Sequence, residues 1–320
     1  MNAYELRKII LESVPEGIEA AHTEHEHRYR RQDVCYDSVT TKLGRIDKSY
    51  LKKWAVNQGI DVVREGLKAI EQGGNESVEQ LLERGRTAHV DVLRQASEDG
   101  TAVHKALEGY LDDWIETGIK PEGCLGYAGG TGSDAETNSS IISALRSAEK
   151  FFGEYELIPV LSEFTVWNDR YQIAGTCDAL FIWFKVYKDK KGDEACEHHY
   201  EENEGNPKRH WCLKCPREVE AKLIIADWKS SNSIQKDDYA WQITAYKYGL
   251  EKATKLKIDD SWVIRFSKHK QEYQILKVNN SSKALKEFAL ISKLDALIKE
   301  REWKHGKLLE PITKPTIITL

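Results

Sequence analysis

The stretch EVEAKLIIADWKSS, residues 218–231, contains an unbroken apolar run that leads into Asp227-Trp228-Lys229. A continuous run of this kind is typical of a central strand that is covered on both faces. Successive side chains of a strand alternate between its faces, so Asp227 and Lys229 should point the same way. We therefore expect a buried strand that presents a carboxylate and an ammonium group side by side at its end.

Segments on either side of this stretch predict its partners. Residues 156–169 and 171–187 predict a strand pair around a tight turn at Asn168-Asp169. Residues 261–268 and 272–278 predict a second hairpin. Helical spacing of apolar residues occurs in three segments, at 143–156, 237–254 and 282–303, the second with Asp237 as its candidate N-cap. We expect an α/β fold (mixed α+β) in which helices flank a core sheet.

The first hundred residues differ from this pattern. Helical spacing covers residues 51–72 and continues through 77–100, and Thr101–Trp114 predicts an amphipathic helix. We therefore expect a helical N-terminal region over residues 1–100 and a core over residues 101–320. A polar insertion rich in Cys and His, residues 187–217, interrupts the core.

The composition limits the class of protein. Of the 320 residues, 40% are hydrophobic and 9% aromatic, so global disorder is excluded. No apolar run approaches the roughly 18 residues of a membrane-spanning helix, and the opening residues lack the apolar segment of a secretory signal. The net charge of -5 means that nucleic acid would need a local basic groove or a metal ion. The cysteine spacing does not suggest a disulfide framework, so we expect a cytoplasmic location.

Acidic side chains at two strand ends are the candidate chemistry. If Asp178 lies on the strand beside Asp227, two carboxylates meet at one site, and such oxygen ligands suit Mg²⁺. A bound cation would lower the pKa of a water molecule and polarise a phosphoryl oxygen. Lys229 would orient that water or stabilise the developing negative charge. His104 would add a nitrogen ligand, which also favours Mn²⁺.

Each of these features also has an ordinary structural explanation. An Asp-x-Lys triplet is commonly a surface ion pair, and a lone helical His is commonly a packed or solvated residue. Gln242 and Tyr246 lie four apart on one helix face and could simply edge a packed helix. The combination in this order is much more specific than any single member.

Taken together, the motifs resemble the RecB-like branch of the PD-(D/E)xK nuclease superfamily, in particular phage-type exonucleases. Four segments are similar to motifs of that family: GTAVHKALEGYL (100–111) to its helical His motif, IAGTCDAL (173–180) to its G-x-x-D motif, IADWKSS (225–231) to its D-x-K strand, and WQITAYKYG (241–249) to its Q-x-x-x-Y helix. SVTTKLGRIDKSYLKKWA (38–55) also resembles the opening of phage members. The resemblance extends from about residue 38 to residue 278.

The resemblance implies a restriction-endonuclease-like core sheet and metal-dependent cleavage of DNA. It assigns catalysis to three side chains, those of Asp178, Asp227 and Lys229. It assigns metal binding to His104, Asp178, Asp227 and the backbone carbonyl of Trp228. It assigns substrate contacts to Gln242, Tyr246 and Ser230. Two further acids, Glu163 and Glu108, are expected beside the metal ligands rather than on the ion.

The insertion is the main departure from the family, which commonly joins the two aspartates by a much shorter connection. Four of its residues could bind a structural Zn²⁺ in a tetrahedral site: Cys196, His198, Cys212 and Cys215. The alternative is an insertion without a ligand. Some relatives carry an iron–sulfur cluster with three Cys after the Q-x-x-x-Y helix. This chain has no Cys after residue 215, so that cluster in its usual form is excluded.

These features predict a Mg²⁺- or Mn²⁺-dependent deoxyribonuclease. We expect an exonuclease acting on linear duplex or single-stranded DNA in phage or mobile-element recombination, replication or repair. Its partner would be a recombination or single-strand-binding protein, and its location the host cytoplasm if a phage encodes it. The alternatives are an endonuclease of the same fold, a non-catalytic DNA-binding module, and an interaction protein whose zinc-bound insertion docks a partner.

Overall fold

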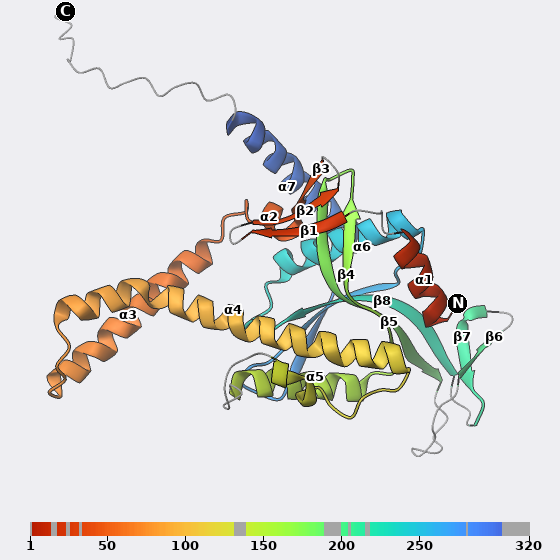
Figure 1. The fold of residues 1–320 in the computed structure, drawn as a ribbon, viewed down its shortest axis with the longest axis horizontal. Helices are drawn as coiled ribbons and strands as arrows, with labels where there is room; N and C mark the ends of the chain where they lie inside the picture. The colour runs from red at the N-terminus through yellow and green to blue at the C-terminus, as the bar shows by residue number, and fades with distance from the viewer. Residues whose placement is uncertain are drawn as a thin grey trace, which may run out of the picture.

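The computed structural model describes residues 2–13, 18–23, 26–31, 34–130, 139–188, 200–203, 206–214, 218–279 and 281–302. In this part of the chain, ten strands form one mixed sheet and helices cover both of its faces (Figure 1). The predicted mixed α/β class is confirmed. Within the same residues, no helix is both long and apolar enough to cross a lipid bilayer.

The elements alternate along the chain. The strands are β1 (Ile18–Thr23), β2 (Glu26–Arg31), β3 (Val34–Ser38), β4 (Leu157–Asn168), β5 (Ile173–Lys188), β6 (Tyr200–Asn203), β7 (Asn206–Cys212), β8 (Glu218–Lys229), β9 (Asp260–Phe266) and β10 (Tyr273–Lys277). The helices are α1 (Ala3–Ser13), α2 (Val39–Leu43), α3 (Ser49–Glu71), α4 (Val78–Thr117), η1 (Leu125–Gly130), α5 (Ser139–Glu154), α6 (Lys236–Thr254) and α7 (Ser281–Glu302).

The strand β8 lies inside the sheet, as its apolar run predicts. It pairs antiparallel with β5 and parallel with β9, and its first residues also pair with β7. The strand β5 pairs antiparallel with β4 along most of its length and parallel with β3 where it begins. The two predicted hairpins, β4–β5 and β9–β10, are therefore confirmed.

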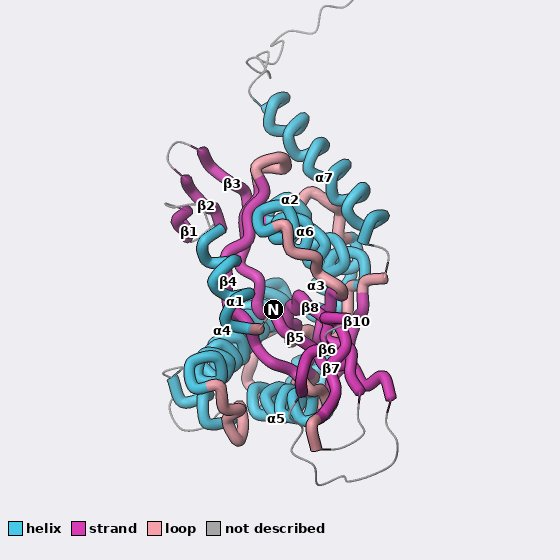
Figure 2. The backbone as a smooth tube through the Cα atoms, turned by 90° about the vertical axis from the view of Figure 1, so that its right-hand side faces the viewer, coloured by secondary structure: helices cyan, strands magenta, loops and turns pink. Residues whose placement is uncertain are grey.

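Side-chain alternation along β8 separates two cores. Ile224 and Trp228 pack in the core that includes the buried residues of α4 and α5. Ile225 packs in the core that includes residues of α1, α2, α6 and α7. Figure 2 shows α4 and α5 on one side of the strands and α6 and α7 on the other. Asp227 and Lys229 thus share the β8 face of Ile225.

The helix α4 is continuous over 40 residues and crosses the expected boundary at residue 100. A capping box formed by Ser77 and Gln80 begins it, and the left-handed backbone of Gly118 ends it. Gly100 lies inside the helix, where an added Cβ would be 3.2 Å from Oγ of Ser230. This glycine therefore allows a close approach to the segment after β8 and does not end the helix.

Two expectations are wrong. One concerns the N-terminal region, and the other concerns the first residue of α6. The short strands β1, β2 and β3 occur where a helical region was expected, and β3 is held in the sheet by β5, a partner remote in sequence. The N-cap of α6 is Gln235, not Asp237. Asp237 lies in the first turn of that helix, where a negative charge still complements the helix dipole.

The predicted insertion contributes a hairpin to the sheet. Its strands β6 and β7 pair with each other, and β7 pairs with the beginning of β8. Cys212 is buried at the end of β7. Cys196, His198 and Cys215 lie outside the described residues. The zinc site therefore stays a prediction.

Candidate active site

The strands β5 and β8 place the two predicted carboxylates next to each other. In their antiparallel register Ala179 is opposite Ala226, so Asp178 and Asp227 occupy adjoining positions at the end of this ladder. The carboxylate of Asp178 accepts a hydrogen bond from the backbone N–H of Trp228. Asp178 is 6% exposed and Asp227 is 2% exposed. Both acids therefore form the floor of the site, withdrawn from bulk water.

The predicted nitrogen ligand comes from α4. Nδ1 of His104 lies 3.4 Å from Oδ1 of Asp178 and 3.7 Å from Oε1 of Glu163. One donor atom from each of these three residues lies within 4.8 Å of the other two. Because the residues come from α4, β4 and β5, only the tertiary fold assembles this cluster of one imidazole and two carboxylates.

Glu163 has an unusual backbone. Its φ of 42° is in the left-handed region, which residues other than glycine rarely adopt. Such a conformation costs about 1–3 kcal/mol and is concentrated at functional sites. This left-handed conformation occurs at the point where Glu163 lies across from Asp178 in the β4–β5 ladder. The structure thus brings the Glu163 carboxylate among the candidate ligands, closer to the centre of the site than the sequence suggested.

Lys229 faces the same site from the end of β8. Its Nζ forms an ion pair with Oδ2 of Asp227, which confirms that the two side chains share a face. Nζ also lies 5.2 Å from the ring centroid of Tyr239 on α6, a cation–π geometry. The Lys229 side chain is 18% exposed. The ammonium group is therefore held beside the carboxylate while part of the side chain still reaches solvent.

Burial and neighbouring charges shift the pKa values of these groups in opposite directions. Burial opposes protonation of His104, but the charge and hydrogen bond of Asp178 outweigh it and raise the pKa of His104 to about 10. Burial raises the pKa of Asp227 to about 6, against the attraction of Lys229. Burial also acts to raise the pKa of Asp178, yet His104 and Lys229 lower it overall. The metal-free site is thus held together by protonated His104 and Lys229.

The donor set fits a hard divalent cation. Carboxylate oxygens of Asp178, Asp227 and Glu163 suit Mg²⁺, and the imidazole nitrogen of His104 also suits Mn²⁺. Buried carboxylates that lie this close need compensating positive charge, which the cation would supply in place of the imidazolium proton. The N–H of Trp228 binds Asp178, while the role of the Trp228 carbonyl as a ligand stays a prediction.

Gln242 and Tyr246 lie beside the sheet as a hydrogen-bonded pair. Nε2 of Gln242 donates to Oη of Tyr246 at 3.3 Å, and both side chains are buried. A Cβ on Gly175 would lie only 2.6 Å from Cε1 of Tyr246. The glycine of the G-x-x-D segment is therefore needed so that this aromatic ring can lie against β5.

Sequence reasoning missed one contact at this edge of the site. Oη of Tyr29 lies 3.0 Å from Oγ1 of Thr176, two positions before Asp178 on β5. Burial raises the pKa of Tyr29, and the charge of Glu163 acts in the same direction. Tyr29 is on β2, so only the unpredicted strands of the N-terminal region could have revealed it.

The remaining predicted residues border a groove above His104. A groove of about 540 Å³ is lined by Ser97, Gly100, Thr101, His104, Lys105, Glu108 and Glu163. Glu108 is therefore close to the site but on the groove wall. Ser230 lies against Gly100, one of the residues that line this groove. The structure thus gathers the candidate ligands with Lys229, whereas Gln242 and Tyr246 form a buried pair of their own.

No protein-family model and no curated protein matches this chain.

Proposed function

We propose that this chain is a Mg²⁺- or Mn²⁺-dependent deoxyribonuclease of the RecB-like PD-(D/E)xK type, acting as an exonuclease on linear DNA. The observation that carries the proposal is the cluster of His104, Glu163 and Asp178 beside the Asp227–Lys229 pair. Ordinary surface ion pairs do not explain it, because Asp178 and Asp227 are nearly fully buried. The order of the four motifs and the mixed sheet support the same proposal.

The proposed reaction is hydrolysis of a phosphodiester bond. His104, Asp178, Asp227 and the adjoining Glu163 would hold the cation, which would lower the pKa of a bound water and polarise the phosphoryl oxygen. Lys229 places a positive charge where negative charge develops as the water oxygen bonds to phosphorus and the sugar oxygen leaves. Gln242 and Tyr246 fix the neighbouring wall, and the groove at Lys105 and Thr101 offers polar groups to the DNA backbone.

The direct test is a nuclease assay on end-labelled linear DNA and closed circular DNA. It is run with Mg²⁺, with Mn²⁺ and with EDTA. Lys229→Ala is the active-site variant, and Lys222→Ala on the same strand is the matched control. We expect metal-dependent loss of the linear substrate but not of the circle. Lys229→Ala should abolish this activity, and Lys222→Ala should retain it. Cleavage of the circle would show an endonuclease, and DNA binding without cleavage would show a non-catalytic module.

The biological setting follows from the same resemblance. We place the enzyme in phage or mobile-element DNA recombination, replication or repair, where linear ends require trimming. Loss of recombination products in cells that carry Asp227→Asn, with normal levels of the protein, is the expected result. Unchanged recombination in those cells would contradict this setting without contradicting nuclease activity.

A further inference from the structure

The outer part of α4 and the whole of α3 form an antiparallel helical hairpin that extends away from the sheet (Figure 1). We call residues 49–95 the arm. Its helices are in close contact, because a Cβ on Gly59 would lie 2.7 Å from the backbone oxygen of Gly85. From Ala102 onward, the buried residues of α4 belong to the core of the body. The arm is thus a tightly packed projection outside the proposed nuclease site.

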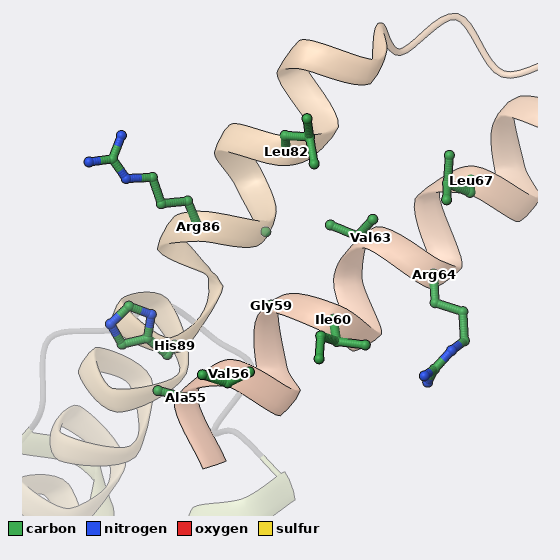
Figure 3. A pocket seen from close by; sticks show the side chains of 11 residues that line it. Ala55, Val56, Gly59, Ile60, Val63, Arg64, Leu67, Leu82, Arg86 and His89 are labelled. Atoms are coloured by element: carbon green, nitrogen blue, oxygen red, sulfur yellow. The ribbon is translucent and has the colours of Figure 1, made fainter. Parts of the chain in front are cut away.

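One side of the arm carries an apolar groove of about 610 Å³, which we call the arm groove (Figure 3). Its apolar lining includes Val56, Ile60, Val63 and Leu67 of α3 and Leu82 of α4. Val56 is 61% exposed, Ile60 48% and Leu82 55%. Large aliphatic side chains gathered in one exposed concavity are typical of an interaction site.

The charged side chains that line the arm groove are basic. They are Arg64 and Arg86, accompanied by His89, and no carboxylate lines the groove in this fully described stretch of chain. Arg64 pairs with Asp61 at 2.7 Å, and Arg86 pairs with Glu83 at 3.7 Å. Neither of these two acids lines the groove. These pairs are between exposed side chains, and such pairs contribute little. Either arginine can therefore exchange its partner for a carboxylate of a ligand.

We propose that the arm groove binds an acidic, amphipathic peptide segment of a partner protein. Apolar side chains of the peptide would fill the space between α3 and α4, in the way that amphipathic helices occupy apolar grooves. Its Asp and Glu side chains would pair with Arg64 and Arg86 at the rim. The groove residues are separate from the proposed nuclease site, so this inference does not depend on DNA cleavage.

The charges favour this occupant over three others. A second copy of the arm, related by a two-fold axis, would bring the basic rims together. Residues 303–320 of this chain contain three lysines and one glutamate, so their charge has the wrong sign. DNA would satisfy the arginines but would set charged phosphates against an apolar floor.

The test is selection of twelve-residue peptides from a random display library on the full-length protein. Selection is repeated on Arg64→Glu/Arg86→Glu and on Lys68→Glu, a charge reversal on α3 outside the groove. Wild type and Lys68→Glu are expected to enrich peptides that combine carboxylates with Leu, Ile or Phe. The double variant is expected to bind those peptides at least about tenfold more weakly by fluorescence anisotropy, a difference of roughly 1.4 kcal/mol, and to enrich basic peptides instead.

Several results would overturn the proposal. One is that no peptides are enriched, or that they are enriched without a charge preference. Another is that the selected peptides bind Ile60→Lys as tightly as the wild type, once circular dichroism has shown that the variant keeps its helical content. A dimer in sedimentation that Ile60→Lys dissociates would assign the groove to a second copy. Weaker DNA binding by Arg64→Glu/Arg86→Glu, with no change in peptide binding, would assign it to DNA.

Discussion

Nδ1 of His104 lies 3.4 Å from Oδ1 of Asp178, a contact that joins the long helix α4 to the sheet at the candidate metal site. Oδ2 of the same carboxylate accepts the N–H of Trp228. Because both of its oxygens have partners on different elements, the Asp178 side chain is fixed before any ion binds. This pre-organisation suits a metal ligand, whose geometry must be held by surrounding contacts.

Replacing His104 by alanine should weaken metal binding. The variant loses the nitrogen donor of the cluster, and we expect Mn²⁺ to bind roughly tenfold or more weakly, by analogy with losses around metal sites. Isothermal titration calorimetry with Mn²⁺ measures this directly. His269→Ala is the control, because His269 is exposed and contacts Asn232. Equal Mn²⁺ affinity in His104→Ala and wild type would remove His104 from the ligand set.

Metal affinity should rise steadily between pH 5.5 and pH 8.5. A cation needs ionised Asp227, whose pKa is raised to about 6, and neutral His104, whose pKa is raised to about 10. Each step up in pH therefore removes a proton that competes with the ion. Calorimetry in buffers of different ionisation enthalpy should also detect proton release on binding. A pH-independent affinity would argue against these two ligands.

The metal-free protein should show the opposite trend in stability. The raised pKa of His104 contributes stability that is fully present below its ordinary value near 6.5 and is lost as the pH approaches about 10. The raised pKa of Asp227 likewise contributes stability that is lost as the pH rises through about 6. In EDTA, we expect Tm to fall from pH 6 to pH 9, and Mn²⁺ to restore it. His104→Gln should flatten the alkaline part of that fall.

Lys229→Met should separate catalysis from metal binding. The substitution removes the positive charge near the reacting phosphate, and we expect kcat to fall by about 10²–10³-fold. Mn²⁺ affinity should be maintained or increased, because a competing cation next to Asp227 is gone. Without metal the protein should be destabilised by about 3 kcal/mol, since a buried carboxylate loses its partner. Loss of Mn²⁺ binding together with activity would contradict this division of roles.

Glu163 offers a test of backbone strain at the site. Glu163→Gly and Glu163→Ala both remove the carboxylate, but only glycine adopts a φ of 42° without strain. Both variants should lose Mn²⁺ affinity equally. The glycine variant should be more stable than the alanine variant by about 1 kcal/mol in urea unfolding. A more stable alanine variant would show that the left-handed backbone is not a source of strain.

Gly175→Ala should destabilise the fold through Tyr246. An added Cβ would lie 2.6 Å from Cε1 of that ring, so we expect a loss of about 1–3 kcal/mol in the free energy of unfolding. Tyr246→Leu should recover much of this loss in a double-mutant cycle. Gly153→Ala is the control, because nothing lies within 4 Å of its added Cβ. Additive effects of the two substitutions would rule out the steric explanation.

The central sheet could be predicted because its strands have strong local signals. The apolar run of β8 and the two strand-like segments around the Asn168-Asp169 turn can be recognised from short-range sequence alone. The prediction that Asp227 and Lys229 share a face also held, because strand alternation is a local property. The strands β1, β2 and β3 are only five or six residues long, and β3 gains its place through pairing with β5, which no local pattern indicates.

The finer parts of the site depend on contacts between remote segments. The place of Glu163 in the cluster follows from a left-handed backbone and a position across from Asp178, neither of which has a sequence signature in a single chain. The Tyr29–Thr176 contact requires β2, in a region that we expected to be helical. The close approach of Gly100 to Ser230 also joins two segments that are remote in sequence, α4 and the residues after β8.

The continuity of α4 has a mechanical consequence. The helix is about 60 Å long at 1.5 Å per residue, and it carries the arm groove near one end and His104 in its C-terminal half. Because the helix is unbroken, a ligand that tilted the arm would also shift the imidazole relative to the two strands. Such coupling would be reciprocal, so a cation held by the imidazole would in turn change how the arm binds its ligand.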